Sequence, residues 1–310
     1  MTGKQIAVIL ALIGAAAVLL GQQQTSKVSQ FESWKAKHGV SYASQFENAY
    51  RERVFLENLA KIEAHNTNNA NTYEMGLNQF SAMTHEEFAE TYLTLLVPEN
   101  FQVVEENNDY TIGDIDWVKE GAVTDVKNQG QCGSCWAFST TGGLEGLSWI
   151  TNKKLENFSE SQLVDCSGSY GNQACNGGLM DNAFKYVKDH GIVHEDEYPY
   201  VPKKNTCKID QGPFKISGFT DVRNCNDLAS ALVNQPVSVA VDASNWSPYK
   251  SGVFNNCRTS LNHGVTLVGT DGDNWVIKNS WGNGWGEKGF IRLAKGNTCG
   301  ICNMASYPKA

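Results

Sequence analysis

Two cysteines close together in the sequence, Cys132 and Cys135, are the residues best placed to do chemistry. They lie in the run Cys132-Gly133-Ser134-Cys135-Trp136. A cysteine attacks a carbonyl carbon only as the thiolate, so it needs a helix amino terminus or a neighbouring imidazolium to lower its pKa. A helix that starts at Cys135 would direct its positive end at the sulfur. The run therefore predicts a nucleophilic thiol at Cys135.

The same spacing allows two other kinds of site. Cys-x-x-Cys is the spacing of thiol–disulfide exchange, but no compact βαβ pattern surrounds it here. A zinc site would combine this pair with Cys299 and Cys302. However, 164 residues separate Cys135 from Cys299, whereas zinc motifs usually leave about 15–20. We therefore expect no metal ion and no cofactor.

A nucleophilic thiol needs a base, and the sequence contains six histidines. His190 and His194 lie in charged runs that are typical of a solvated surface. His263 enters an apolar run 128 residues after Cys135, and Asn279 follows it by sixteen residues. The amide oxygen of Asn279 could accept a hydrogen bond from one imidazole nitrogen. These features favour His263 as the base.

The segment that starts at Gln129 resembles the nucleophile segment of papain-like cysteine proteases, whose pattern is C-G-[SA]-C-[WY] with His and Asn roughly 130–150 residues downstream. The resemblance implies that Cys135 is the nucleophile, that His263 is the base, and that Asn279 orients the imidazole. It also implies that Gln129 donates a hydrogen bond to the oxyanion, and that Trp281 covers the His–Asn pair and belongs to the substrate-binding residues.

The elements that must position these residues change character along the chain. From Cys135 to Val187 the apolar spacing predicts helices, and the pair Gly142-Gly143 suggests close packing against a neighbouring element. From Pro213 onward, short β-rich runs predict strands: Phe214 to Ile216, Val237 to Val241, His263 to Val268, Trp275 to Ile277 and Phe290 to Leu293. The resemblance implies an α+β, papain-like fold in which a helical lobe and a β-barrel-like lobe meet at an active-site cleft.

The part of the chain before residue 111 has the pattern of a helical leader. Six residues are spaced to share one helix face: Glu47, Arg51, Phe55, Asn58, Ile62 and Asn66. They resemble the propeptide signature of cathepsin L-like zymogens, and residues 76–80 resemble its next motif, although Ala82 stands where that motif has aspartate. The resemblance implies an inhibitory propeptide over residues 22–110, here called the leader. The peptidase domain over residues 111–310 is here called the body.

The resemblance also implies disulfides and a substrate pocket. Nine cysteines less one nucleophile leave eight, and the implied pairs are Cys132–Cys175, Cys166–Cys207 and Cys257–Cys299. The remaining Cys225 and Cys302 form either a fourth pair or two buried free thiols. Gly178 would leave room for the substrate backbone. A pocket for the residue two places before the cleaved bond would be lined by Leu179, Met180, Ala240, Leu261, Gly264 and Met304.

This apolar lining predicts a hydrophobic or aromatic residue in the pocket. The short segment from Cys166 to Cys175 has no room for an occluding insertion, so we expect an endopeptidase acting on proteins and peptides. The leader would act as an intramolecular inhibitor, and cystatin-type proteins are further expected inhibitors. The alternative is a catalytically weak papain-like relative that acts as a binding or inhibitory protein.

The composition limits the cellular setting. The net charge is −8, which excludes the basic footprint of a nucleic-acid-binding protein. Lys4 precedes an apolar run of fifteen residues from Ile6 to Leu20, the layout of a secretory signal peptide over residues 1–21. We expect a monomer in the secretory pathway that reaches a lysosome or equivalent digestive vacuole or is secreted, with no stable membrane insertion. Sequons at Asn157 and Asn245 are candidate glycan sites.

Overall fold

The structure is a computed structural model that describes residues 27–99, 101 and 113–310. The predicted signal peptide (1–21) and the predicted start of the body near Thr111 lie outside the described residues. Residues 27–38 are helical, and the α-helices that follow are α2 (Gln45–Asn66), α3 (His85–Tyr92), α4 (Cys135–Asn152), α5 (Glu160–Cys166), α6 (Met180–His190) and α7 (Cys225–Asn234). The strands are β1 (Tyr73–Met75), β2 (Gly218–Val222), β3 (Val237–Val241), β4 (Tyr249–Phe254), β5 (His263–Asp271), β6 (Asn274–Lys278), β7 (Phe290–Leu293) and β8 (Ala305–Lys309).

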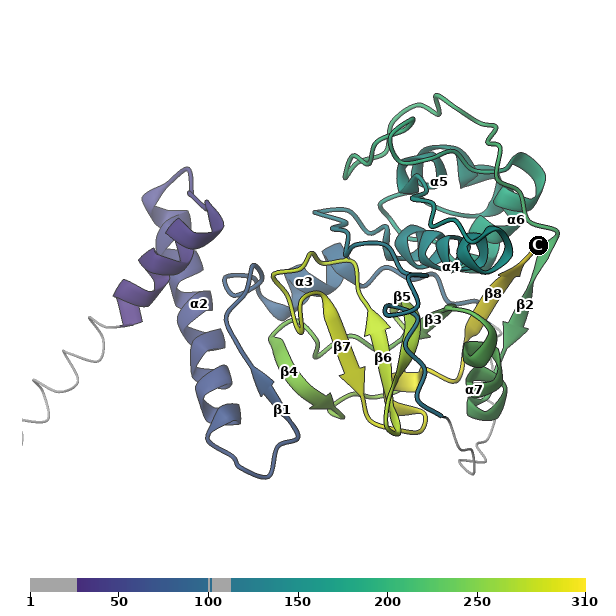
Figure 1. Cartoon of the computed structure of the whole chain (residues 1–310). Coiled ribbons are helices and arrows are strands. Elements are labelled where there is room, and N and C mark those ends of the chain that lie inside the picture. The colour runs from purple at the N-terminus through teal and green to yellow at the C-terminus, as the bar shows by residue number, and fades with distance from the viewer. Residues whose placement is uncertain (1–26, 100, 102–112) are drawn as a thin grey trace, which may run out of the picture.

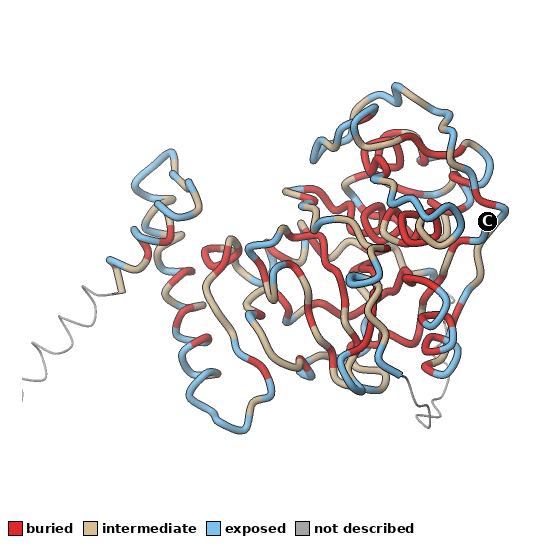
Figure 2. The backbone as a smooth tube through the Cα atoms, in the orientation of Figure 1, coloured by how far each residue is buried: buried red, intermediate tan, exposed pale blue. Residues whose placement is uncertain are grey.

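The body is divided into a helical lobe and a sheet lobe. Helices α4, α5 and α6 pack together above the strands in Figure 1. The strands follow one another in the order β1-β4-β7-β6-β5-β3-β8-β2. Each lobe has its own buried apolar cluster, and Figure 2 shows buried residues concentrated along α4 and the central strands. The predicted α+β, two-lobed architecture is confirmed.

Helix α4 is held tightly against the sheet lobe. A Cβ at Gly142 would collide with Thr266 of β5, and one at Gly143 would lie 2.9 Å from the hydroxyl of Ser238 on β3. The hydroxyl of Ser238 also donates to the carbonyl oxygen of Ser139 on α4 at 2.7 Å. The paired glycines therefore permit the close packing that the sequence suggested, and they fix the start of α4 relative to β5.

The leader forms a helical unit that joins the sheet lobe at one edge. All six residues of the predicted helix face lie in α2. Asn58 donates to the carbonyl oxygens of Ser81 and Met83, and Asn66 donates to that of Met75. Strand β1 then pairs antiparallel with β4, so that the leader extends the sheet by one strand. The prediction of a helix that contains these six residues is confirmed.

Two sequence-based expectations about elements are wrong. Residues 214–216 form no strand; Phe214 makes a single bridge to Ile192, and the strand begins only at Gly218, where pairing with β8 becomes possible. The segment after it, expected to be β-rich, contains helix α7. The side chain of Asn224 caps that helix, and buried Leu228 and Leu232 are spaced by one helical turn. Helical spacing therefore prevailed over the strand-like composition around it.

Four disulfides hold the body together, and they join the cysteines Cys132–Cys175, Cys166–Cys207, Cys225–Cys302 and Cys257–Cys299. The three pairs implied by the resemblance are present. Cys225 and Cys302 are also bonded, which removes the alternative of two free buried thiols. Among the residues that the structure describes, Cys135 is the one free cysteine.

Candidate active site

Cys135 is the first residue of α4, directly after the N-cap residue Ser134. The hydroxyl of Ser134 makes no capping bond to the helix and instead lies 2.7 Å from the hydroxyl of Tyr200. The amides of the first turn and the helix dipole therefore place partial positive charge around the Cys135 thiol, which favours a thiolate. This is the position expected of a nucleophilic cysteine.

His263 is the first residue of β5 and lies beside the start of α4. A Cβ at the next residue, Gly264, would be 3.5 Å from the carbonyl oxygen of Cys135. Nε2 of His263 is 2.9 Å from Oδ1 of Asn279, and the backbone N–H of Ser280 donates to the same oxygen at 2.8 Å. An amide oxygen can only accept, so Nε2 carries the proton of the neutral ring. Nδ1 is left buried and without a hydrogen-bond partner.

Two tryptophans enclose the imidazole of His263. The ring centroid of Trp281 lies 4.8 Å from that of His263, and the ring centroid of Trp246 lies 6.1 Å away. Trp281 also contacts aromatic residues of the leader, including Phe80 and Phe88. Trp281 therefore covers the imidazole, and it lies outside the apolar cluster that contains Leu179.

Gln129 is fully buried, and its amide has a fixed orientation. Its Oε1 accepts from the hydroxyl of Ser280 at 2.7 Å and from Nε1 of Trp281 at 3.1 Å. Its Nε2 donates to the carbonyl oxygen of Cys132 at 3.0 Å. Because Nε2 carries two protons, one N–H remains for another acceptor. These contacts fit the predicted oxyanion donor.

Residues 92–98 of the leader run through the site. The backbone N–H of Leu95 donates to the carbonyl oxygen of Asn262 at 3.1 Å, and that of Leu96 donates to the carbonyl oxygen of Gly178 at 2.9 Å. Leu95 and Gly178 form a parallel bridge. A Cβ at the preceding residue, Gly177, would collide with the carbonyl oxygen of Thr94, whereas one at Gly178 would lie 2.6 Å from the ring of Trp136 within the body. The leader therefore occupies the place predicted for a substrate backbone.

Burial shifts the pKa values of the two candidate catalytic residues in the precursor. Thr94 contacts Cys135 and Tyr92 contacts His263, and both covered side chains are fully buried. Burial raises the pKa of the Cys135 thiol. It lowers the pKa of His263 to about 4, although the hydrogen bond to Asn279 opposes this shift. With the leader in place, both groups are therefore neutral near pH 7.

The predicted pocket residues lie together, with one correction to their character. Leu179, Met180 and Ala240 are buried in one cluster with leader residue Leu95, and Leu261 and Met304 pack against it. A Cβ at Gly264 would lie 3.1 Å from the sulfur of Met180. A cavity beside Leu179 and Met304 is also lined by charged side chains, namely Asp181, Asp221 and Arg223. These charges could not be assigned to the pocket from the sequence, because Asp181 lies on α6 and the other two lie about forty residues later, on β2 and just beyond it.

Arg51 of α2 connects the segment of Ala82 to α3 within the leader. The Arg51 guanidinium donates to the backbone carbonyl oxygen of Ala82 at 3.2 Å and to the carboxylate of Glu87 at 2.6 Å. Ala82 itself is buried among apolar leader residues. Arg51 therefore joins the backbone at position 82 to the carboxylate of Glu87 on α3.

We expect the Arg51–Glu87 contact to weaken in acid. Burial alone would raise the pKa of Glu87, but hydrogen bonds from Arg51 and the backbone of Thr84 leave it lowered. A carboxylate with a lowered folded pKa stabilises the fold above its unfolded pKa, about 4.3. That stability is lost as the pH falls through the folded value. Glu87→Gln should lower the melting temperature of the precursor at pH 6 and flatten its pH dependence between about pH 3 and 5.

The measurement is thermal unfolding of the full precursor across this pH range, followed by circular dichroism. Glu90→Gln is the matched control, because Glu90 is exposed on the same helix. An unchanged pH dependence in Glu87→Gln would show that other carboxylates control the leader.

Comparison with known proteins places this site in a family. Residues 112–309 match the family model described as "Papain family cysteine protease". Residues 31–88 match the one described as "Cathepsin propeptide inhibitor domain (I29)". It is 46% identical over 309 residues to Cathepsin L 2 of Paramecium tetraurelia, covering 96% of this chain and 98% of that protein. The structure resembles digestive procathepsin L 3 of Tenebrio molitor larval midgut, with a TM-score of 0.82, 39% identity and coverage of 92% and 99%. The recombinant stem bromelain precursor matches with a TM-score of 0.82, 37% identity and the same coverage.

The chain therefore belongs to the papain family of cysteine proteases. The inhibitor domain matches the leader, and the cathepsin L relatives match nearly the whole chain. It is thus a cathepsin L-like precursor, a cysteine endopeptidase made with a propeptide that acts as its intramolecular inhibitor.

Proposed function

We propose that this endopeptidase cleaves peptide bonds by acyl transfer through Cys135 and His263, oriented by Asn279. The proposal rests on the 2.9 Å hydrogen bond between Nε2 of His263 and Oδ1 of Asn279. This bond leaves Nδ1 as the ring nitrogen available to a thiol at the start of α4. When the leader departs, water reaches both groups and burial no longer disfavours their charged forms. The thiol then transfers its proton to Nδ1.

The reaction then proceeds in two halves. The Cys135 thiolate attacks the carbonyl carbon, and the oxyanion accepts hydrogen bonds from the Gln129 amide and from the backbone N–H of Cys135. His263 gives its proton to the leaving amine as the C–N bond breaks. Water, deprotonated by His263, then attacks the thioester and releases the thiol and the carboxylic acid product.

The leader contacts support a substrate preference and explain why the leader is not cut in place. We propose that the pocket holds a hydrophobic or aromatic residue two places before the cleaved bond. Leu95 of the leader lies in the same apolar cluster as the pocket residues.

The leader contacts His263 first, then Cys135, and then the pocket. A substrate with that residue in the pocket passes these groups in the opposite order. The leader therefore lies in the cleft with reversed chain direction.

The setting of the enzyme is also a proposal. We infer a signal peptide over residues 1–21, a leader over 22–110 and a body over 111–310, which acts as a monomer in a lysosome, a digestive vacuole or outside the cell. Within the described part of the chain, no helix has the length and apolar character needed to cross a bilayer. Asn157 and Asn245 are exposed, which is compatible with glycans. Cystatin-type inhibitors would compete for the cleft.

The test is chemical labelling of the processed enzyme. The full precursor is incubated at roughly pH 4–5, where carboxylates begin to protonate, and then treated with an epoxide inhibitor directed at protease thiols. We expect one label per chain, on the peptide that contains Cys135, and parallel loss of peptidase activity. The unprocessed precursor at neutral pH should resist the label, because the leader covers Cys135. A label on another residue would contradict the proposal.

A further inference from the structure

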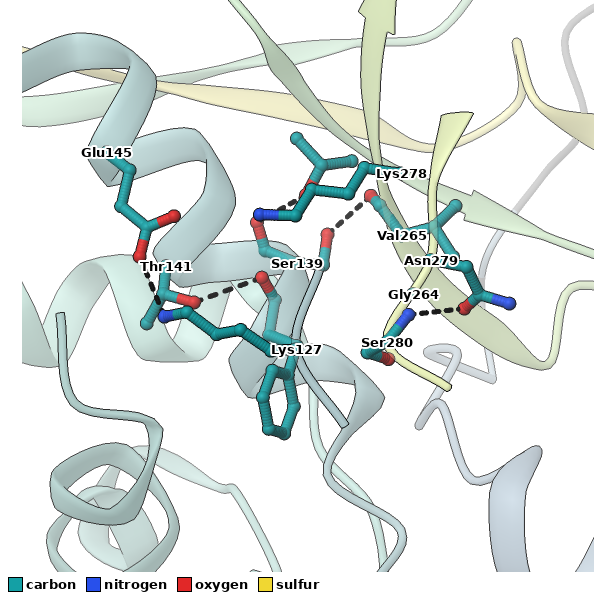
Figure 3. Close-up of a pocket in the computed structure, with 11 residues that line it drawn as sticks. Lys127, Ser139, Thr141, Glu145, Gly264, Val265, Lys278, Asn279 and Ser280 are labelled. Carbon is teal, nitrogen blue, oxygen red and sulfur yellow. Dashed lines mark hydrogen bonds and ion pairs between the residues drawn. The ribbon is translucent and has the colours of Figure 1, made fainter. Parts of the chain in front are cut away.

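Four charged residues form a charge cluster behind the active site: the half-buried Lys127 and the buried Glu145, Glu160 and Lys278. Nζ of Lys127 is 2.8 Å from Oε1 of Glu145 and 2.6 Å from Oε1 of Glu160. Nζ of Lys278 donates to Oγ1 of Thr124 at 2.8 Å, and that hydroxyl donates to Oε2 of Glu145 at 2.6 Å. Figure 3 shows Lys127 joined to Glu145 and Lys278 close to the same helix. The sequence did not reveal this cluster, because charged residues normally lie at the surface.

The two carboxylates of the cluster lie on helices of the helical lobe. Lys127 lies on the segment that leads into the active site. Glu145 lies on α4, the helix that begins at Cys135. Lys127 lies two residues before Gln129, and its ammonium is held by both carboxylates. The cluster therefore fixes the segment of Gln129 relative to the helix of Cys135.

Lys278 comes from the opposite lobe. It is the last residue of β6 and directly precedes Asn279. The chain beyond it runs beside the segment of Lys127, since the N–H of Gly282 donates to the carbonyl oxygen of Lys127 at 2.9 Å. Lys278 thus reaches from the sheet lobe, through Thr124, to the carboxylate of Glu145. Its side chain links the strand that ends beside Asn279 to the helix that begins at Cys135.

Several charged side chains surround the ammonium group of Lys278. It faces Glu145 of α4, Glu160 of α5, and Lys127 and Asp125 of the preceding segment. Burial lowers the pKa of Lys278 to about 8, although the nearby carboxylates oppose the shift. A buried ion pair often adds little net stability compared with apolar residues. The hydrogen bonds of the cluster instead restrict the position of β6 relative to α4.

We propose that Lys278 is a positioning residue for proteolysis: its link to Glu145 through Thr124 holds Asn279, and with it the His263 imidazole, in place relative to Cys135. This inference rests on the proposed function of those three residues. Lys278 itself touches no substrate. Its removal should impair the reaction step more than substrate binding, because the substrate pocket is built from other residues.

The test compares three variants of the full precursor, each processed and titrated with the epoxide so that rates are expressed per competent site. Lys278→Met removes the charge, and Thr124→Val removes only the bridging hydroxyl. Thr140→Val is the matched control, because the Thr140 hydroxyl bonds only within α4, to the carbonyl oxygen of Trp136. We expect kcat to fall about 10- to 100-fold in Lys278→Met, with little change in KM. Thr124→Val should show a smaller fall, and Thr140→Val should keep the wild-type kcat.

A second readout separates positioning from simple loss of stability. Alkylation of Cys135 by iodoacetamide reports thiolate formation, and its acidic midpoint should move up by about one pH unit in Lys278→Met, a tenfold change in the thiolate–imidazolium equilibrium. The double variant Lys278→Met with Glu145→Gln also removes the negative charge that Lys278 no longer balances in the cluster. It should regain thermal stability while kcat stays low.

Recovery of kcat in the double variant, or wild-type kcat in Lys278→Met, would overturn the positioning role. Failure of the wild-type enzyme to label at Cys135 would instead overturn the proposed function. The two failures are therefore distinguishable.

Discussion

Replacing Cys135 by alanine is expected to lower kcat by about 10⁶-fold, the scale seen when a protease nucleophile is removed. Cys135 is the one free cysteine among the described residues, and it opens the helix beside His263. Alanine leaves no atom that can form the acyl bond. The remaining oxyanion donors and pocket can bind a substrate but cannot open this covalent route. The measurement is kcat on a peptide substrate after the leader has been removed.

The fold should tolerate this change, which makes the result interpretable. Alanine is smaller than cysteine and suits the first turn of a helix, and all four disulfides remain. Cys135→Ser is the companion variant, because it keeps the size and places a poorly ionised hydroxyl at the same position. Both variants should unfold within a few degrees of wild type. Activity above about one per cent of wild type in Cys135→Ala would mean that another group is the nucleophile.

Replacing Gln129 by alanine is expected to lower kcat by about 10²- to 10³-fold, the cost of losing one oxyanion donor. Hydrogen bonds from Ser280 and Trp281 fix its Oε1, so its Nε2 is already oriented before the reaction begins. The contact forms fully only when charge develops on the substrate oxygen. KM should therefore change much less than kcat.

Two further variants identify the cause of this effect. Gln129→Glu keeps the shape and removes the N–H donor, so it should be at least as impaired as Gln129→Ala. Gln162 is an equally buried glutamine whose amide bonds to Tyr186 and Gly191. Gln162→Ala should lower thermal stability while kcat per titrated site stays close to wild type. If Gln129→Ala retained kcat within threefold, the donor role would be wrong.

The active-site residues could be predicted from the sequence because each lies in a short local pattern. Cys135 and Gln129 lie in one run of the sequence. His263 begins one apolar strand, and Asn279 directly follows another. Leader residues Thr94 and Leu95 could not be predicted, since their partners lie far along the chain and nothing in their own neighbourhood marks a contact.

The charge cluster and helix α7 could not be predicted from the sequence, for two different reasons. In the sequence, Lys127 and Glu145 resemble surface residues, and only the fold brings them together beneath the active site. Helix α7 was missed because β-rich runs surround it, although Asn224 and the spacing of Leu228 and Leu232 carry a helix signal. Local patterns therefore reveal chemistry better than they reveal which distant segments meet.

The pairing of β1 with β4 has a consequence beyond inhibition. While the leader is attached, β1 covers the backbone groups at one side of β4. Its removal makes β4 an outer strand with unpaired N–H and C=O groups, and such an edge can accept a strand from another chain. Lys250 and the register shift opposite Met75 are features that limit such pairing. Processing therefore uncovers a second backbone surface, at the sheet edge formed by β4, at a distance from the catalytic cysteine.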